Sequence, residues 1–217
     1  MTPLATDLAT TLPELLLAGG LCLVLALDMF LKDARRDITY LASILLLAVV
    51  SWSLFGRPVT AGADLAFGGS FVDDSLARVL KLFAIASVAT VFVYSRPYLQ
   101  ARALYQGEFY VLGLFGLLGI LVLASSYSLL VSYLGLELLS LSLYALVAFN
   151  RDSPASAEAA MKYFVLGAIA SGTLLYGMSL VYGVTGSLNV GELRAALGAG
   201  GAETTVLWVG LAFLVAG

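Results

Sequence analysis

The sequence predicts an all-α fold, a bundle of helices that crosses a lipid bilayer several times. Three observations support this fold class. The 217 residues are 61% hydrophobic and only 12% charged, with a mean hydropathy of +1.00, whereas about a quarter of the residues in a soluble domain are charged. Apolar segments of about 20 residues, the length of a helix that spans the hydrocarbon core, recur along the chain. Charge, glycine and proline are concentrated between those segments.

The first three predicted spans cover residues 12–31, 38–55 and 75–94. A secretory signal peptide would carry positive charge ahead of its apolar region. The first basic residue is Lys32, which follows the first apolar segment. We therefore expect the first span to be retained as a membrane helix.

The next apolar stretch, residues 109–149, has 41 residues. As one helix it would be about 60 Å long, twice the thickness of the hydrocarbon core. The stretch must therefore turn back on itself, and its polar cluster at residues 125–128 is the place for the turn. The fourth, fifth and sixth spans are accordingly predicted over residues 109–125, 128–149 and 155–182.

The chain becomes polar and glycine-rich over residues 183–205. Asn189 and Glu192 have the spacing of a capping box, which predicts a short interfacial helix ending near Leu197. The last apolar run, residues 206–217, would be only about 18 Å long as a helix. We therefore expect six full spans and the start of a seventh, in one membrane domain that is the N-terminal part of a longer protein.

The basic residues predict how the helices are oriented. Those that follow the first, third and fifth spans are Lys32, Arg35, Arg36, Arg96, Arg102 and Arg151, and those that follow the second, fourth and sixth are Arg57 and Arg194. Cytoplasmic loops are enriched in lysine and arginine. The first set is therefore predicted to be cytoplasmic and the N-terminus to lie on the opposite side.

Composition also excludes several classes of function. The chain has no histidine and a single cysteine, Cys22, so ligands for haem, zinc and iron–sulfur clusters are lacking, and no metal or cofactor is expected to bind. The net charge of −3 and the absence of basic runs argue against a nucleic-acid partner. No phosphate-binding glycine motif opens a helix.

Glu137 is the most informative residue, because it falls near the middle of the fifth span. A charged side chain at that depth costs about 2.5–3.5 kcal/mol and by default indicates function. At helical spacing Tyr133, Ser140 and Tyr144 share its face as supporting polar residues. The alternative is a neutral glutamic acid whose hydrogen bonds only hold two helices together.

Lys162 lies several residues into the sixth span, with Thr173 and Tyr176 on the same helical face. The alternative is that it snorkels to the cytoplasmic interface. Glu158, four residues earlier, either pairs with Lys162 or belongs only to the solvated start of the helix. We favour the second interpretation of Glu158.

The other charges in the spans give weaker signals. Arg78 and Lys81 are explained by partial snorkelling or by internal salt bridges. Glu14 and Asp28 fall near opposite ends of the first span and are expected to be interfacial. Small residues that allow close helix packing are Gly113, Gly116, Gly119, Gly167, Ser171 and Gly172.

An acid and a base within the membrane are what a proton relay requires. Low dielectric raises the pKa of a carboxyl group and lowers that of an amine, so that both exchange protons near neutral pH. Proximity would couple the two titrations. Glu137 and Lys162 are therefore the candidate proton-pathway residues.

Residues 131–147 and 158–178, which contain Leu-Gly-Leu-Glu ending at Glu137 and Met-Lys-Tyr around Lys162, closely resemble the antiporter-like membrane subunits of respiratory complex I. Among these the likeness is greatest to the subunit N family of the bacterial NADH:quinone oxidoreductase, and it extends over the whole chain. The resemblance implies an inverted-repeat fold in which Glu137 and Lys162 match proton-pathway positions. The family also has a lysine in the seventh span and a second, inverted set of helices, both beyond this sequence.

The resemblance further implies proton translocation across a bacterial inner membrane, with a periplasmic N-terminus and other membrane subunits of complex I as partners. Electron transfer from NADH to quinone, with flavin and iron–sulfur clusters, would occur in other subunits. Three alternatives remain: a subunit of a multisubunit cation/proton antiporter, a purely structural membrane subunit, or a subunit of a related hydrogenase or photosynthetic complex.

Overall fold

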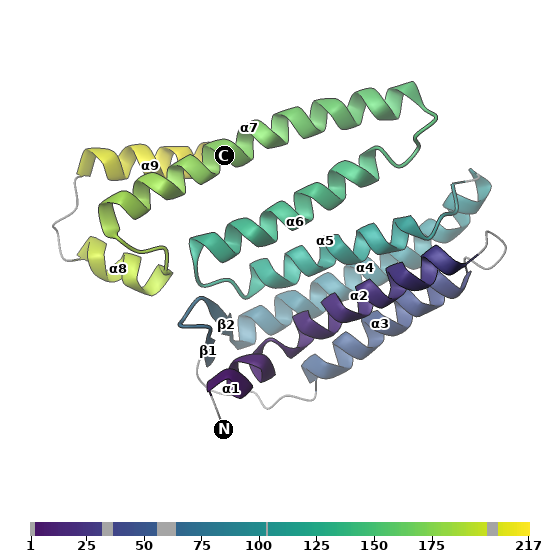
Figure 1. Ribbon diagram of the computed structural model, residues 1–217, viewed down its shortest axis with the longest axis horizontal. Helices are drawn as coiled ribbons and strands as arrows, with labels where there is room; N and C mark the ends of the chain where they lie inside the picture. The colour runs from purple at the N-terminus through teal and green to yellow at the C-terminus, as the bar shows by residue number, and fades with distance from the viewer. Residues whose placement is uncertain (1–2, 32–36, 56–63, 103, 199–203) are drawn as a thin grey trace.

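The computed structural model in Figure 1 describes residues 3–31, 37–55, 64–102, 104–198 and 204–217. These residues form an all-α bundle with one short β-hairpin, as the sequence predicts for the fold class. The helices are α1 (Pro3–Thr10), α2 (Leu12–Phe30), α3 (Asp37–Phe55), α4 (Ser75–Ala101), α5 (Glu108–Ala124), α6 (Leu129–Val147), α7 (Pro154–Thr185), α8 (Val190–Gly198) and α9 (Thr204–Ala216), and the strands are β1 (Asp64–Ala66) and β2 (Phe71–Asp73).

Each segment predicted to span the membrane coincides with a helix. Five of the described helices, α2, α3, α4, α6 and α7, are long and apolar enough to cross a membrane, and α5 and α9 are shorter apolar helices. The chain is therefore a multi-pass membrane protein. The long apolar stretch turns back where the sequence predicts, since α5 ends at Ala124 and α6 begins at Leu129. Helix α4 continues through Pro97, beyond its predicted end.

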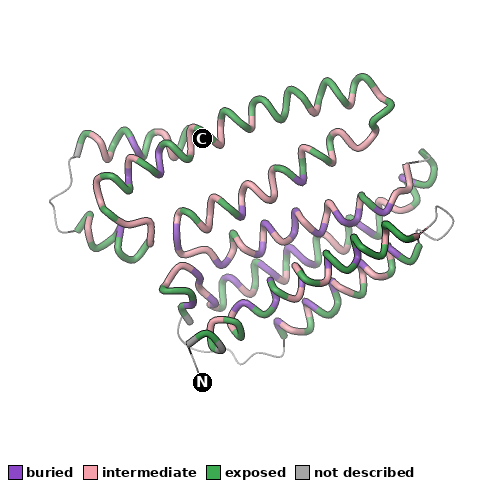
Figure 2. Tube along the Cα trace, in the orientation of Figure 1, coloured by how far each residue is buried: buried purple, intermediate pink, exposed green. Residues whose placement is uncertain are grey.

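The buried residues are concentrated where α2, α3, α4 and α5 pack together, whereas most of α7 is exposed (Figure 2). Helix α5 is central to this core, because Tyr110, Leu114 and Leu121 on it have no exposed surface. The ring of Phe92 on α4 lies edge-on to the ring of Tyr110, with centroids 5.1 Å apart. Interlocked apolar side chains thus fix α2, α3, α4 and α5 relative to one another.

Helices α5 and α6 approach each other at two glycines. A Cβ atom on Gly119 would lie 2.6 Å from the carbonyl oxygen of Gly135, and a Cβ on Gly135 would lie 2.9 Å from that of Gly119. Only residues without a side chain permit this separation of the two backbones. The packing role expected of Gly119 is therefore confirmed, whereas a Cβ on Gly172 would meet no atom within 4 Å.

A hydrogen-bonded layer at one end of the bundle was not predicted. Strands β1 and β2 pair antiparallel, and the turn between them uses Gly68 and Gly69 with φ of 64° and 82°. The hairpin then joins the α5–α6 turn, where Val72 N donates to Ser125 O at 2.8 Å. The α5–α6 turn in turn joins the α7–α8 connection, where Val190 N donates to Tyr127 O at 3.1 Å. Three connections distant in sequence therefore form one end of the molecule (Figure 1).

The membrane orientation remains a prediction. Lys32, Arg35, Arg36 and Arg57 lie outside the described residues. The other members of the two basic sets belong to opposite ends of the bundle: the end of α4 and the α6–α7 connection at one end, and α8 at the other (Figure 1). This separation is compatible with the positive-inside arrangement.

Candidate functional site

Glu137 is half-buried on α6 and is hydrogen-bonded to α7. The hydroxyl of Ser171 on α7 donates to Glu137 Oε1. The hydroxyl of Tyr133, one turn before Glu137, lies 2.9 Å from Ser171 Oγ. A serine hydroxyl has one hydrogen to donate, so Tyr133 is the donor to Ser171. The three side chains form a continuous chain of hydrogen bonds that ends at the carboxylate.

Ser171 is the site residue that sequence reasoning missed. It was grouped with the small residues that allow helix packing, because one serine in an apolar helix differs little from Thr173 or Ser179 nearby. Its role depends on how α7 is placed against α6. That placement is a tertiary property with no local signal in the sequence.

The remaining polar residues of the α6 face behave differently. Ser140 is half-buried three residues after Glu137 and takes no part in the hydrogen-bonded chain. Tyr144 packs edge-on against the rings of Tyr163 and Phe164, with centroids 4.9 Å and 5.6 Å apart. A Cβ atom on Gly167 would overlap the Tyr144 hydroxyl, so the glycine leaves space for this hydroxyl.

Lys162 lies on an exposed part of α7, and its ion-pair partner within the described chain is Glu158, with Nζ 2.6 Å from Oε1. The favoured interpretation of Glu158 is therefore wrong, because the i,i+4 spacing brings the two charges together. The expected polar line from Lys162 is not continuous. Thr173 donates to the carbonyl of its own helix at Ile169, and the ring of Tyr176 packs on Phe213 of α9 at 5.2 Å.

A second pair of charges is buried in the first half of the chain. Lys81 on α4 has no exposed surface, and its Nζ lies 2.6 Å from Oε1 of Glu14 on α2. Glu14 lies in the first turn of α2, near the end of the span as predicted, but it is buried against α4 and only 6% exposed. Of the two explanations given for Lys81, the internal salt bridge is the one observed. Apolar helices can bury these two charges because the ammonium group and the carboxylate pair with each other.

Asp28, which was also expected to be interfacial, is half-buried, and its Oδ1 accepts a hydrogen bond from Thr39 at 2.7 Å. At the same end of the bundle, Arg96 donates to Asp37 Oδ1 at 2.9 Å and Tyr105 donates to the same oxygen at 2.7 Å. Burial, and then the neighbouring Asp37 carboxylate, raise the pKa of Tyr105. This cluster is structural in character, because it joins the ends of α3 and α4 to the segment before α5.

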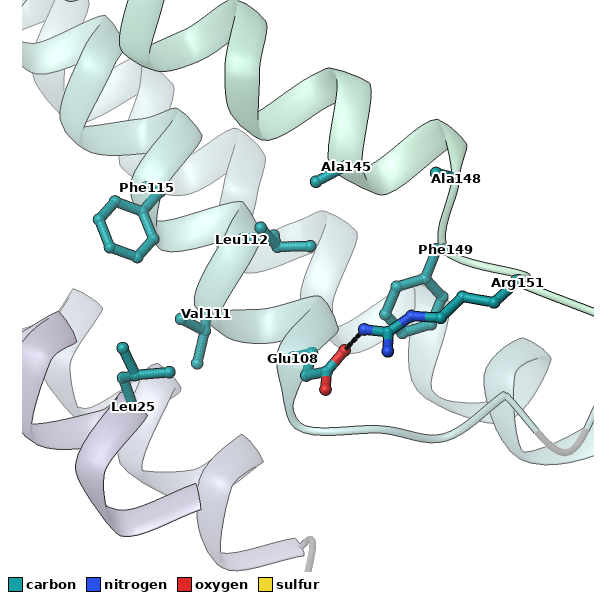
Figure 3. A pocket seen from close by; sticks show the side chains of 9 residues that line it. All are labelled: Leu25, Glu108, Val111, Leu112, Phe115, Ala145, Ala148, Phe149 and Arg151. Atoms are coloured by element: carbon teal, nitrogen blue, oxygen red, sulfur yellow. Dashed lines mark hydrogen bonds and ion pairs between the residues drawn. The ribbon is translucent and has the colours of Figure 1, made fainter. Parts of the chain in front are cut away.

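An apolar groove of about 590 Å³ lies between α2, α5 and α6 (Figure 3). Its wall includes Leu25, Val111 and Phe115. One side is formed by the ion pair between Arg151 and Glu108, whose Nη2 and Oε2 atoms are 2.5 Å apart. Glu137 does not line the groove. Over the described part of the chain, no group of three or more potential ligands is placed to hold a metal ion.

Comparisons with known proteins cover nearly the whole chain, and a family match covers the segment that carries Glu137. Residues 126–217 match the NADH:quinone oxidoreductase/Mrp antiporter transmembrane family. The chain is 51% identical over 214 residues to NADH-quinone oxidoreductase subunit N of Thioalkalivibrio sulfidiphilus, which covers 97% of this chain and 44% of that protein. It is 52% identical over 209 residues to subunit N of Thiobacillus denitrificans, covering 96% and 43%.

A solved structure gives the same result for the fold. A chain of respiratory complex I from Thermus thermophilus with bound aureothin superposes with a TM-score of 0.73 at 31% identity, covering 94% of this chain and 42% of that one. The chain thus spans less than half the length of the curated relatives it matches. Residues 126–217 thus belong to the NADH:quinone oxidoreductase/Mrp antiporter transmembrane family, and nearly the whole chain is similar in sequence and fold to antiporter-like membrane subunits such as subunit N of NADH-quinone oxidoreductase.

Proposed function

We propose that the chain forms part of a proton-translocating membrane subunit of a bacterial NADH:quinone oxidoreductase, with Glu137 as the residue that takes up and releases the proton. The observation that supports this proposal is the chain of hydrogen bonds from Tyr133 through Ser171 to Glu137. It lies within the part of the sequence that matches the family of quinone oxidoreductases and antiporters.

The hydrogen-bonded chain is suited to proton transfer. When Ser171 gives its hydrogen to the Glu137 carboxylate, the Ser171 oxygen takes the hydrogen of Tyr133, and Tyr133 is then reprotonated from beyond the chain. One O–H bond breaks and one forms at each step. The donated hydrogen bond also stabilises the ionised form of Glu137, which offsets part of the cost of a carboxylate between apolar helices.

Lys162 is proposed as the second ionisable residue of the pathway. Its pair with Glu158 lies on an exposed face near the start of α7, and an i,i+4 pair on a helix surface contributes only about 0.3–0.5 kcal/mol. Lys162 therefore exchanges partners at little cost. Thr173 and Tyr176 lie further along α7 without a described contact to this pair.

The redox chemistry belongs to partners in this proposal. NADH, flavin, iron–sulfur clusters and quinone are assigned to other subunits of the complex, and neighbouring membrane subunits transmit the driving change to Glu137. The subunit lies in the bacterial inner membrane with its N-terminus in the periplasm. The layer formed by β1, β2 and the α5–α6 turn then faces the periplasm as well.

The test is Glu137→Gln in the full-length subunit within the intact complex. Inverted membrane vesicles are expected to lose proton pumping while subunit content is retained. Glu108→Gln, which removes the carboxylate of an exposed ion pair on α5, is the matched control and is expected to pump normally. An unchanged ratio of protons to electrons in Glu137→Gln would contradict the proposal.

The family description also covers Mrp antiporters, so a multisubunit cation/proton antiporter is the second candidate. Purification distinguishes the two, because a complex I subunit is recovered with flavin and iron–sulfur proteins. A purely structural subunit is tested by the double variant Glu137→Gln, Lys162→Ala. Full pumping by that variant would support the structural role.

A further inference from the structure

The pair formed by Glu14 and Lys81 has no role in the function proposed above. Glu14 lies in the first turn of α2 and Lys81 in the second turn of α4. Both helices begin at the end of the bundle where α1 and the β1–β2 hairpin pack (Figure 1). The pair therefore lies near one end of the bundle, in the part of the chain before the segment that matches the family.

The pair is buried but poorly provided with hydrogen bonds. The side chain of Lys81 is wholly buried and that of Glu14 is 8% exposed. Lys81 Nζ, which has three hydrogens to donate, lies 2.6 Å from Glu14 Oε1 and 5.2 Å from the centre of the Phe71 ring. Glu14 Oε2 has no hydrogen-bond partner in the described part of the chain.

This geometry narrows the difference in free energy between the charged and the neutral form of the pair. A buried ion pair repays its desolvation only when further hydrogen bonds satisfy the remaining protons and lone pairs. Here the second carboxylate oxygen and the other ammonium hydrogens lack those bonds. A neutral amine beside a carboxylic acid avoids most of the desolvation cost.

Other charges face the pair from the neighbouring elements. Asp73 on β2 is close enough to repel the Glu14 carboxylate. Arg78, one turn before Lys81, lies 3.3 Å from Asp73, and Asp74 caps the backbone of α4 at Ala77. Asp73 and Arg78 are only slightly exposed.

We infer that Glu14 and Lys81 form a second proton-exchange site, separate from Glu137, that alternates between an ion pair and a neutral amine–acid pair. In this exchange an N–H bond of the Lys81 ammonium breaks and an O–H bond forms on Glu14, so the net charge is unchanged. The amine lone pair then accepts a proton from water at the hairpin end. That proton gives the pair one positive charge, which faces the negative charge of Asp73.

The exchange itself is a property of the two side chains, and its contribution to transport rests on the proposed function. A proton that enters or leaves at this site changes the field at the start of α4. The site therefore gives the first part of the chain an ionisable element that the Glu137 chain does not supply.

Lys81→Arg is the discriminating variant. A guanidinium retains the charge and the ion pair with Glu14 but is always protonated, so a purely structural pair tolerates the change and an exchange site does not. The double variant Glu14→Gln, Lys81→Met removes both charges at similar volume, which buried pairs tolerate. This double variant still tests the inference if the larger arginine side chain does not fit at position 81. Arg96→Lys, at an exposed pair on the same helix, is the control.

Two readouts are measured on the intact complex that contains the full-length subunit. Infrared difference spectra recorded on a change of pH are expected to show a carboxylic acid signal that is lost in Glu14→Gln and retained in Glu137→Gln. Inverted vesicles are expected to show a loss of protons pumped per electron in Lys81→Arg and in the double variant. NADH oxidation and subunit content are expected to remain, and Arg96→Lys to behave as the parent.

The outcomes separate this inference from the proposed function. Normal pumping by Lys81→Arg and by the double variant, with no signal assigned to Glu14, overturns the inference and leaves the role of Glu137 intact. Normal pumping by Glu137→Gln, together with a Glu14 signal and a loss in Lys81→Arg, refutes the role of Glu137 and supports the second site.

Discussion

The hydroxyl of Ser171 on α7 donates a hydrogen bond to the carboxylate of Glu137 on α6. The two residues are 34 positions apart in the chain, and the contact forms because α6 and α7 pack side by side. The Tyr133 hydroxyl donates to Ser171 Oγ and so extends the contact by one more hydrogen bond. The Glu137 carboxyl group, which is costly to place in a membrane, thus lies where α7 supplies a hydrogen-bond donor.

Replacing Ser171 tests this contact directly. Ser171→Ala removes the donor, and because a hydrogen bond to a charged group is worth about 1.5–3 kcal/mol, the ionised form of Glu137 is destabilised. We expect slower proton pumping in inverted vesicles, with retention of activity in Ser171→Thr. Ser179→Ala, which removes an exposed hydroxyl bonded to its own helix, is the control. Equal pumping by Ser171→Ala and Ser179→Ala would show that the bond is not used.

Gly167 and Tyr144 give a prediction about stability. Gly167→Ala places a Cβ atom against the Tyr144 hydroxyl, and such overpacking costs about 1–3 kcal/mol. We expect a lower midpoint of thermal unfolding for the purified full-length protein. Adding Tyr144→Phe removes the hydroxyl and is expected to restore most of the loss.

Gly172 on the same helix is the control for that pair. A Cβ atom there meets nothing within 4 Å, and alanine is favoured over glycine in a helix by about 0.8–1.0 kcal/mol. Gly172→Ala is therefore expected to be neutral or stabilising. A loss as large as that of Gly167→Ala would mean that Tyr144 is not the cause.

A third prediction concerns the contact between α5 and α6. Gly119→Ala brings a Cβ to within 2.6 Å of the Gly135 carbonyl oxygen and 2.7 Å of the Leu139 nitrogen, and backbone atoms cannot move aside as a flexible side chain can. We expect strong destabilisation and poor assembly, measured as the amount of subunit recovered from membranes. Gly116→Ala, where the nearest atom is 3.6 Å away, is expected to assemble normally.

The fourth prediction concerns pH. The pKa of Tyr105 is raised above its ordinary value of 10.0, by burial first and then by its hydrogen bond to Asp37. A raised pKa means that the protonated tyrosine is favoured in the folded state, so its stabilising contribution is complete below the ordinary pKa and is lost as pH rises through the raised one. The stability difference between the parent and Tyr105→Phe is therefore expected to shrink as pH rises from the ordinary pKa of 10.0 through the raised pKa of Tyr105. A difference that stays constant throughout alkaline pH would refute this linkage.

The long helices and Glu137 were accessible from sequence because their signals are local. An apolar run of 41 residues cannot cross a bilayer once, so the turn at residues 125–128 follows from length alone. An acid in the middle of such a run stands out without knowledge of its neighbours.

The remaining features depend on which segments meet in space. Glu14 and Lys81 are 67 positions apart, and neither sequence neighbourhood marks the other as its partner. The strands of the hairpin are three residues each, too short for a pattern of alternation. Glu158 was misjudged because its place at the helix start suited solvation as well as it suited an i,i+4 pair.

The layer that joins the hairpin to the α5–α6 turn and the α7–α8 connection also holds α6 and α7 together. Leu129 N at the start of α6 donates to Leu188 O just after α7, at 2.9 Å, so the two helices are clamped together at that end. At the opposite end they are joined by a single turn near Asn150. The two helices are therefore joined at both ends, by a backbone hydrogen bond at one end and by a short covalent connection at the other, and the contact between Glu137 and Ser171 lies between these two fixed points.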